Sequence, residues 1–339
     1  MRPSLCFCAT GKTGLGHLRR VTNIASALRQ CAPDVDLQLL TNASVEGLGD
    51  DERQLYRRIV HAERSQMASL LQPQPPSLVV VDTAVVPELE QLPSRLALIL
   101  RETRADKLSD FVLPERPWDL LLLPHAADDW RPPAATIACR QQRSVGWIYR
   151  REDRTTDPLP LGAPPAAGMP QLLIAAGAGG GGDRWEAFNQ ALTQLIPAVR
   201  QGLSQGLEVI QVIGPRATPA EHLALADRRI QPGPRLNELF PQADLVISTM
   251  GYNSALELAA SDVPVLMMAK PTTYDDQQAR AARWHGRVGW AYDLHPPEAA
   301  LNWLIDTLHQ RRRRPPVALA ESGAPVAAKA LLELLQAGP

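Results

Sequence analysis

The stretch that decides the fold runs from Asp244 to Gln278 and reads DLVISTMGYNSALELAASDVPVLMMAKPTTYDDQQ. Its apolar run, Leu245 to Ser248, stops at the turn Thr249-Met250-Gly251, and apolar residues at helical spacing follow at once. A second short strand is expected over Val263 to Met268, before a polar run. Carboxyl ends of neighbouring parallel strands share one edge of a sheet, where helix N-termini present unpaired N–H groups to anions. The stretch therefore predicts an anion site suited to a diphosphate.

The overall composition is that of a globular protein without a strong charge. The chain has 339 residues, more than one core usually contains, and 45% of them are apolar, so we expect two domains. The formal net charge is -1 and the pI is about 6.7. This balance gives no general attraction to nucleic acid or anionic lipid, which disfavours a polyanion-binding role.

No segment has the pattern of an export signal or a membrane span. The N-terminal apolar run ends near Ala9, too early for a signal peptide, and no run approaches the roughly 20 apolar residues of a membrane helix. The cysteines have neither zinc nor redox spacing: Cys6, Cys8, Cys31 and Cys139. We therefore expect a soluble, cytoplasmic protein with no disulfide and no metal site.

The two halves of the chain repeat one order of elements. Each begins with a strand and a glycine loop: Leu5 to Thr10 with Gly11 to Gly16, and Leu172 to Ala176 with Gly177 to Gly182. Further strands are expected at Val35 to Thr41, Leu78 to Asp82, Leu96 to Arg101, Asp119 to Leu123, Ser144 to Ile148 and Leu207 to Ile213. The main helices are expected around Leu18 to Leu28, Leu55 to Leu71, Val86 to Leu92, Trp185 to Leu203, Pro219 to Asp227, Leu236 to Pro241, Ala255 to Ala260, Gln277 to Trp284 and Pro297 to Gln310. This alternation predicts two parallel Rossmann-like sheets.

A run rich in proline and glycine, residues Thr155 to Pro170, separates the halves and has the composition of a linker. The expected organisation is an N-terminal Rossmann-like domain over residues 1–155, a linker over 156–170, a second domain over 171–325 and a C-terminal helix over 326–339. The sequence does not decide on which domain the last helix packs.

The glycine loops do not carry the signatures of other nucleotide-binding proteins. Gly11, Gly14 and Gly16 do not form G-x-G-x-x-G, and the next strand ends without an acidic residue. The second loop fits that spacing, but a run of glycines matches it easily, and its following strand again lacks a ribose-binding acid. Neither loop carries the full Walker pattern G-x-x-x-x-G-K-[ST], because Cys6 stands where the glycine that opens it would be in the first loop and the second loop has no lysine. These features disfavour a nicotinamide or flavin enzyme and a P-loop NTPase.

Two motifs resemble those of a known family. The first is Gly14-x-Gly16-His17-x-x-Arg20, and the second is the run Ser248 to Glu257. With the two halves, they make the chain similar to the GT-B glycosyltransferases, especially the family 28 group that includes the peptidoglycan lipid-intermediate N-acetylglucosaminyltransferase and a predicted glycosyltransferase branch. The resemblance implies an α/β, GT-B architecture in which two Rossmann-like domains face each other across a cleft.

The resemblance also implies a donor site in the second half. Glu257 matches the family's carboxylate that bonds the ribose hydroxyls of the donor, a task suited to two acceptor oxygens. Gln277, with Gln278 and Asp276, matches the cluster that holds the sugar hydroxyls, although an aspartate here also suits a helix cap. Asp183 closes the glycine loop where better-known members carry a serine, and we expect it to cap the next helix. The other donor-binding candidates are Gly16, Gly177, Gly179, Gly180, Gly214, Met250, Gly251, Asn253 and Ser254.

The catalytic base is expected in the first half. His17 opens the first helix, whose N-terminus keeps an imidazole neutral and able to accept a proton from an acceptor hydroxyl. Contact with the diphosphate or the acceptor, or a capping role, stays open for the same residue. Asp82 and Glu102, near strand ends, are the alternative bases. Arg20 is expected either to complement an anion or to be solvated.

The expected function is the inverting, metal-independent transfer of a sugar from a nucleotide donor, UDP by family resemblance, to the hydroxyl of an unidentified acceptor. No cofactor and no nucleic-acid partner are expected, and the run Arg311 to Arg314 allows at most peripheral membrane contact. Two alternatives stay open. One is a nucleotide-sugar hydrolase or epimerase of the same fold, and the other is a non-catalytic nucleotide-sugar sensor or partner subunit.

Overall fold

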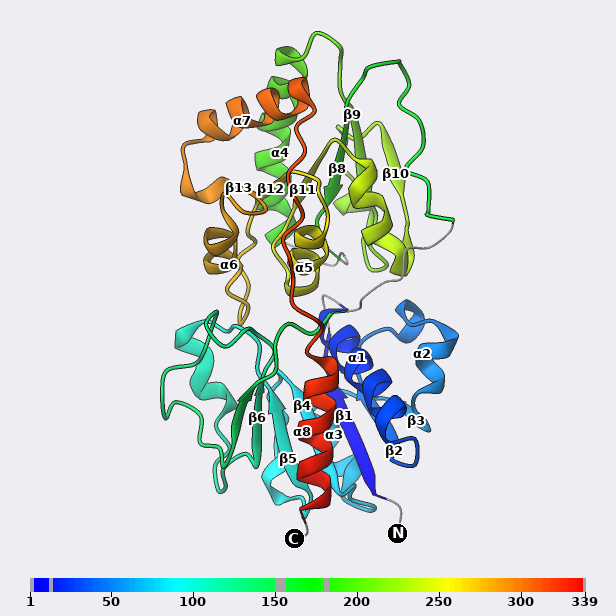
Figure 1. Cartoon of the computed structure of the whole chain (residues 1–339), viewed down its shortest axis with the longest axis vertical. Coiled ribbons are helices and arrows are strands. Elements are labelled where there is room, and N and C mark those ends of the chain that lie inside the picture. Colours follow the sequence, from blue (N-terminus) through cyan, green and yellow to red (C-terminus); the bar gives the residue numbers. More distant parts are fainter. Residues whose placement is uncertain (1–2, 12–14, 150–156, 178, 180–182, 338–339) are drawn as a thin grey trace. The chain divides into compact units, whose positions relative to one another are not determined.

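The computed structural model describes residues 3–11, 15–149, 157–177, 179 and 183–337, and the chain divides into two compact units (Figure 1). The first unit comprises Met1–Arg151, Thr273–Asp275 and Ala320–Pro339, and the second comprises Glu152–Thr272 and Asp276–Leu319. Each unit is built on one parallel sheet with its own buried core.

The sheet of the first unit has seven parallel strands in the order β3-β2-β1-β4-β5-β6-β7. The strands are β1 (Ser4–Ala9), β2 (Asp36–Thr41), β3 (Arg58–His61), β4 (Leu78–Asp82), β5 (Arg95–Ile99), β6 (Leu120–Leu123) and β7 (Gln142–Ser144). The strand order changes direction between β1 and β4, which pair in parallel. Open α/β sheets bind ligands at the carboxyl ends of the strands beside such a switch point.

The sheet of the second unit repeats this plan with six parallel strands in the order β10-β9-β8-β11-β12-β13. The strands are β8 (Gln171–Ala175), β9 (Glu208–Val212), β10 (Arg228–Ile230), β11 (Leu245–Ser248), β12 (Val265–Met267) and β13 (Gly289–Ala291). Every residue of β8, β9 and β11 is buried, as expected for strands that are covered on both faces. The switch point lies between β8 and β11, the strand that opens the deciding stretch.

Helices connect the strands and cover the sheets. Those of the first unit are α1 (Gly16–Cys31), α2 (Asp50–Gln54), α3 (Arg64–Leu71) and α8 (Ala324–Gln336). Those of the second unit are α4 (Asp183–Gly202), α5 (Tyr252–Ala260), α6 (Gln277–Trp284) and α7 (Pro297–Gln310). Short 3-10 helices are η1 (Val45–Gly47), η2 (Leu89–Gln91), η3 (Ala105–Phe111), η4 (Pro219–Glu221), η5 (Gly233–Gln242) and η6 (Tyr292–Leu294).

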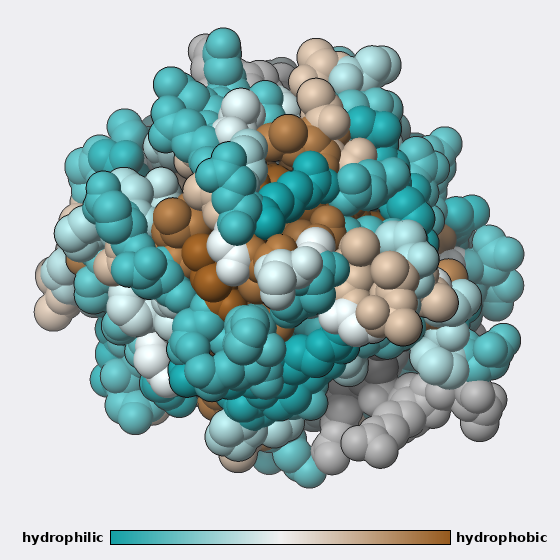
Figure 2. Space-filling view, turned by 90° about the horizontal axis from the view of Figure 1, so that it is seen from above, coloured by the Kyte–Doolittle hydropathy of each residue, from teal (hydrophilic) through white to brown (hydrophobic). Residues whose placement is uncertain are grey.

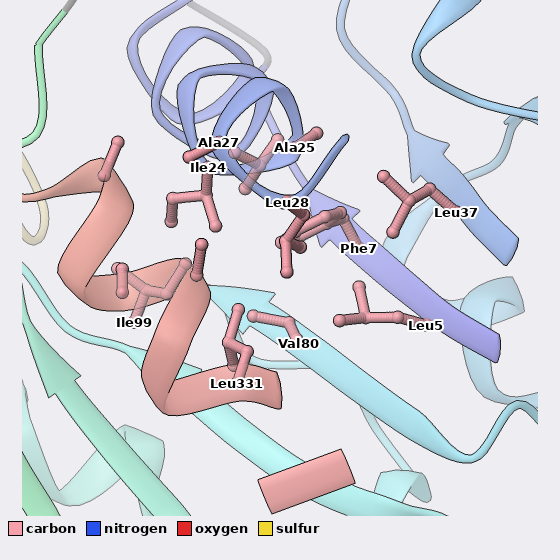
Figure 3. Close-up of a cluster of buried hydrophobic side chains, with 14 of the residues drawn as sticks. Leu5, Phe7, Ile24, Ala25, Ala27, Leu28, Leu37, Val80, Ile99 and Leu331 are labelled. Carbon is pink, nitrogen blue, oxygen red and sulfur yellow. The ribbon is translucent and has the colours of Figure 1, made fainter. Parts of the chain in front are cut away.

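The C-terminal helix α8 packs in the core of the first unit, beside α1 (Figure 1). Its Leu331 is fully buried in the same apolar cluster as Phe7 of β1 and Leu28 of α1 (Figure 3). Gly323, just before the helix, touches the backbone of β7's loop so closely that an added Cβ would lie 2.1 Å from the carbonyl oxygen of Val145. The sequence does not decide on which domain this helix packs, and the structure places it on the first unit.

The predicted elements are wrong in two ways, because some expected helices contain only a short 3-10 helix and some short strands have no pattern of their own. The helix expected over Leu55 to Leu71 divides into β3 and α3, and the helices expected over Val86 to Leu92 and Pro219 to Asp227 contain only η2 and η4. The strand expected over Ser144 to Ile148 forms earlier, as β7. Strands β3, β10 and β13 have three or four residues each, too few for the alternating pattern that identifies a strand.

The surface agrees with a chain whose apolar residues are mostly in cores. On the face drawn in Figure 2, hydrophilic side chains predominate and surround a smaller area of apolar ones. Within the described part of the chain, no helix combines the length and the apolar content needed to cross a bilayer.

Candidate functional site

Several loops converge at the carboxyl edge of the second sheet. Gly179, in the loop after β8, has φ of +87°, and a Cβ added there would lie 2.3 Å from the backbone nitrogen of Ala217 in the loop after β9. A Cβ at Gly177 would lie 3.9 Å from Oγ1 of Thr249, in the turn after β11. Gly214 opens the β9 loop, where its carbonyl accepts a hydrogen bond from Ala217 at 3.1 Å. Only glycine fits at position 179, so the loop backbone comes close to its neighbours without a side chain between them.

The turn after β11 is held from two sides. The Ser248 hydroxyl donates to the carbonyl of Ala175 at the end of β8, with a 3.0 Å separation. Arg280 of α6, which is fully buried, donates from Nη1 to the carbonyl of Met250 at 2.6 Å. Gly251 then caps α5 in an extended conformation. The first N–H groups of α5 are thereby fixed at the switch point, where a helix N-terminus favours an anion.

Three predicted donor residues lie on the first two turns of α5. Asn253, Ser254 and Glu257 are half-buried, whereas Leu256 and Leu258 between and beside them are fully buried. Asn253 Oδ1 is buried and has no hydrogen-bond partner within the part of the chain that the structure describes. A buried polar atom of this kind is a candidate contact for a ligand, because unsatisfied acceptors are costly in a folded protein.

Two side chains of the polar run at the start of α6 accept hydrogen bonds from backbone N–H groups. Asp276 caps α6 by accepting a hydrogen bond from the N–H of Ala279 at 3.0 Å, so the capping role is confirmed. Gln277 accepts from the backbone N–H of Lys270 through Oε1 at 3.0 Å. Gln278 is exposed on the first turn of the helix. All three residues belong to the second unit.

Asp275, the residue just before this group, belongs to the first unit. Its carboxylate forms an ion pair with Arg101, and the short segment pairs with the first unit through a bridge to Thr103. Tyr274 packs edge-on against Phe111, with 5.6 Å between ring centroids. The polar run is therefore divided between the two units: Asp275 belongs to the first, whereas Asp276 and the residues after it belong to the second.

In the first unit, His17, Arg20 and Asp82 meet at the switch point between β1 and β4. Arg20 donates from Nε to Asp82 Oδ2 at 2.9 Å and from Nη2 to Asp82 Oδ1 at 2.8 Å, and both residues are buried. The solvated alternative for Arg20 is therefore wrong. Nδ1 of His17 lies 3.3 Å from Asp82 Oδ1. Thr83, directly after Asp82, has a positive φ of 42°, a strained conformation that often accompanies functional sites.

The charges of this group follow from its surroundings. Burial raises the pKa of Asp82, but Arg20 and then His17 outweigh burial and lower it to about 2. Burial lowers the pKa of His17; Asp82 opposes this effect, while Arg101 and Arg20 add to it. At neutral pH Asp82 is charged and His17 is neutral. If the proton of His17 is on Nδ1 and directed to Asp82, Nε2 is free to accept a proton.

Glu102 and Gly16 are the other described residues of the first unit that the sequence predicts for the site. Glu102 is buried, and its backbone N–H donates to Nε2 of the buried His125 at 2.7 Å. Gly16 is the first residue of α1, directly before His17. Gly14 of the first motif and Gly180 of the second glycine loop lie outside the described residues, as does the side chain of Asp183.

Comparisons with known proteins bear on the fold and on part of the sequence. No family model matches the chain. A UDP-N-acetylglucosamine--N-acetylmuramyl-(pentapeptide) pyrophosphoryl-undecaprenol N-acetylglucosamine transferase from Synechococcus sp. (strain CC9605) is 28% identical over 180 residues, which cover 52% of this chain and 48% of that protein. The chain thus spans about half the length of the curated relatives it matches.

Solved structures match over nearly the whole chain. The spinosyn rhamnosyltransferase SpnG has a TM-score of 0.56 at 16% identity, with 99% of this chain and 96% of SpnG covered. MurG from Acinetobacter baumannii has a TM-score of 0.55 at 14% identity, with 98% and 99% covered. The chain has the GT-B fold. The predicted GT-B fold class is therefore confirmed, and SpnG has also been solved in complex with thymidine diphosphate, at a TM-score of 0.52 and 17% identity over 99% of this chain and 97% of SpnG.

Sequence reasoning missed three parts of these sites. The Arg20–Asp82 pair depends on β1 and β4 being neighbours, which the order of elements along the chain does not state. Arg280 lies outside the deciding stretch. Lys270 is the only basic residue between Asp244 and Gln278, but its contacts depend on how the segments of the sheet are arranged.

Proposed function

We propose that this GT-B protein is a glycosyltransferase that moves a hexose from a UDP-linked donor to a hydroxyl group of an acceptor, with inversion and without a metal ion. The observation that carries the proposal is the switch point of the second sheet. There, the loop that contains Gly177 and the close-packed Gly179, the braced Met250-Gly251 turn and the N-terminus of α5 converge. Backbone N–H groups and a helix dipole of this kind suit a diphosphate.

The donor residues are proposed from the resemblance and from their placement. Glu257 accepts hydrogen bonds from the two ribose hydroxyls, and Asn253 offers its buried Oδ1 to a ligand hydroxyl or amino group. Gln277 and Gln278 contact the sugar. UDP is favoured as the carrier because the curated relative is named for a UDP-linked sugar, and SpnG was solved with another pyrimidine nucleoside diphosphate.

The proposed reaction is a direct displacement. The acceptor oxygen attacks the anomeric carbon on the face opposite the diphosphate, and the bond from that carbon to the phosphate oxygen breaks with its electron pair. The hydroxyl proton passes to Nε2 of His17 in the tautomer whose Nδ1 donates to Asp82, from which it is separated by 3.3 Å. Asp82 acts as a positioning residue rather than as the base, because its carboxylate is buried and bonded to Arg20. Glu102 is likewise buried, so His17 is the base that the geometry supports best.

A nucleotide and nucleotide-sugar panel tests the proposal. Binding to the folded state raises the melting temperature by mass action, so UDP and UDP-hexoses should raise it, while adenosine nucleotides should not. Release of UDP from the preferred donor is then measured with and without a mixture of acceptor alcohols. Faster release with an acceptor, together with a glycoside product of inverted configuration, supports the proposal. Equal release in both cases identifies a hydrolase, and tight binding without release identifies a sensor.

A further inference from the structure

Lys270 reaches over the end of the central strand of the second unit. It lies two positions after Met268, beyond the end of β12, and its ammonium Nζ donates to the carbonyl of Ala176, just after β8, at 3.1 Å. Because the strand order is β8-β11-β12, the side chain must pass the carboxyl end of β11 to make this bond. The ammonium therefore lies at the switch point, one residue from Gly177.

The surroundings of Lys270 hold the charge in place. Nζ lies 5.3 Å from the ring centroid of Trp185 and 5.1 Å from that of Phe188, both on α4. The backbone N–H of Lys270 donates to Gln277 Oε1 at 3.0 Å, which fixes the residue at its other end. A cation over aromatic faces is attracted by their electron density, yet a half-buried ammonium still loses part of its hydration. A positive charge held at the switch point attracts an anionic ligand.

A second donor adjoins the same place. The indole Nε1 of Trp185 is buried, with the residue only 7% exposed, and it has no hydrogen-bond partner among the residues that the structure describes. Trp185 lies in the first turn of α4, directly after the glycine loop. An indole N–H can only donate, so its missing partner must be an acceptor. A cation and an unsatisfied N–H donor on one aromatic platform thus both favour an acceptor-rich anion.

We propose that Lys270, with the indole N–H of Trp185, binds the diphosphate of the donor and stabilises the charge that this group gains as it leaves. The inference rests on the proposed function and adds a cation to a site otherwise built from glycines and a helix N-terminus. An ammonium acts on phosphate as a point charge, in the place that a metal ion takes in other transferases. Lys270 is the single basic residue of the deciding stretch. The stretch also has five acidic residues: Asp244, Glu257, Asp262, Asp275 and Asp276.

The alternative role for Lys270 is a purely structural tie between strand ends. If Lys270 only links the strand ends, its loss disturbs the loop whichever ligand is bound. Binding of uridine, UMP and UDP should then weaken equally, and the melting temperature of the free protein should fall. A phosphate contact acts on charge. Its loss weakens UDP binding most, UMP binding less and uridine binding least, and it flattens the dependence of UDP affinity on salt.

Titration calorimetry on the full chain separates the two roles. For Lys270→Met, which retains much of the apolar stem, the affinity for UDP should fall about 10- to 100-fold while that for uridine stays within about twofold. Lys270→Arg keeps a cation and should retain most of the affinity for UDP. Trp185→Phe keeps an aromatic ring under the ammonium and removes the N–H, and should lower the affinity for UDP several-fold. Lys329→Met, which removes an exposed lysine from α8, is the matched control.

The outcomes distinguish this inference from the proposed function. If the wild-type protein binds none of the three compounds, the proposed function fails and the inference fails with it. If the wild-type protein binds UDP and Lys270→Met binds it equally well, or loses uridine and UDP to the same extent, only the inference is overturned. Should Lys270→Met unfold, the comparison of Lys270→Arg and Trp185→Phe with the wild-type protein decides.

Discussion

Asp82 accepts a hydrogen bond from Arg20 on each of its two carboxylate oxygens, at 2.8 and 2.9 Å, with both side chains buried. The pair joins α1 to the end of β4 across the switch point of the first sheet. His17 contacts the same carboxylate, so the pair also sets the position of the proposed base. A buried charge whose partner is removed is costly, which makes this pair important for stability as well as for catalysis.

Replacing Arg20 by methionine should lower the free energy of unfolding by about 3–5 kcal/mol, because the Asp82 charge is then buried without its partner. Urea denaturation followed by circular dichroism measures the change. The double variant Arg20→Met/Asp82→Leu should recover part of the loss, since no charge then stays buried. Arg53→Met removes an exposed pair with Asp50 and should have a far smaller effect. Equal losses for Arg20 and Arg53 would contradict a buried pair.

Replacing His17 by alanine should lower kcat by about 10²- to 10⁴-fold, the usual effect of removing a general base, with UDP affinity within about twofold of wild type. The pH profile gives an independent readout. Burial lowers the pKa of His17, so the neutral, active form persists at neutral pH. Activity should fall only as the pH decreases below the ordinary histidine value of about 6.5. Full activity of the variant, or an acid limb above pH 7, would rule out His17 as the base.

Replacing Glu257 by alanine should weaken UDP binding about 10- to 100-fold, because two charge-assisted hydrogen bonds to the ribose are lost. The affinity for a 2'-deoxy nucleotide should fall less, since it offers one hydroxyl fewer. Calorimetry measures both affinities. Glu298→Ala, at an exposed position on α7, is the control and should bind as wild type. An unchanged affinity for UDP in Glu257→Ala would remove this residue from the donor site.

Gly179→Ala should weaken UDP binding and lower the melting temperature, because the new Cβ would lie 2.3 Å from the backbone nitrogen of Ala217. The two loops must then separate. Gly168→Ala is a matched control, since Gly168 also has a positive φ, of 79°, but no atom lies within 4 Å of an added Cβ. That control should show only the backbone strain of about 1–2 kcal/mol. Equal effects on UDP affinity would contradict the close packing of the two loops.

Leu331→Ala should destabilise the first unit by about 2–5 kcal/mol, the usual cost of truncating a buried leucine. Leu331 is fully buried against α1 and the sheet, whereas Val326 on the same helix is 53% exposed. Val326→Ala should therefore have little effect on urea denaturation. If both substitutions had the same small effect, α8 would not be part of the core.

The central strands could be predicted because they are buried on both faces. β4 and β8 have continuous apolar runs. β4 ends in an aspartate and β8 is followed by a glycine loop, and each of these features marks the carboxyl end of its strand. The edge strands could not be predicted from the sequence. β10 reads Arg-Arg-Ile, and its place in the sheet depends on pairing with β9 rather than on any pattern of its own. Local sequence has no signal for such strands, because tertiary pairing stabilises them.

The sites were predictable to the extent that they depend on local motifs. The turn at Gly251 and the cap at Asp276 follow from neighbouring residues. The contacts of Lys270 with Ala176 do not, because they join segments 94 residues apart and require the strand order of the sheet. A single basic residue in an acidic stretch was the available signal for Lys270.

Because α8 belongs to the first unit, we expect the first unit to complete its core after the second one during synthesis. Domains generally fold from the N-terminus as the chain leaves the ribosome, but the core of the first unit is incomplete until residues 320–336 have been made. Apart from the short segment Thr273–Asp275, the second unit is one continuous stretch of chain and has all its strands before that point. We therefore expect the nascent N-terminal sheet to keep part of its apolar face uncovered until α8 has been made.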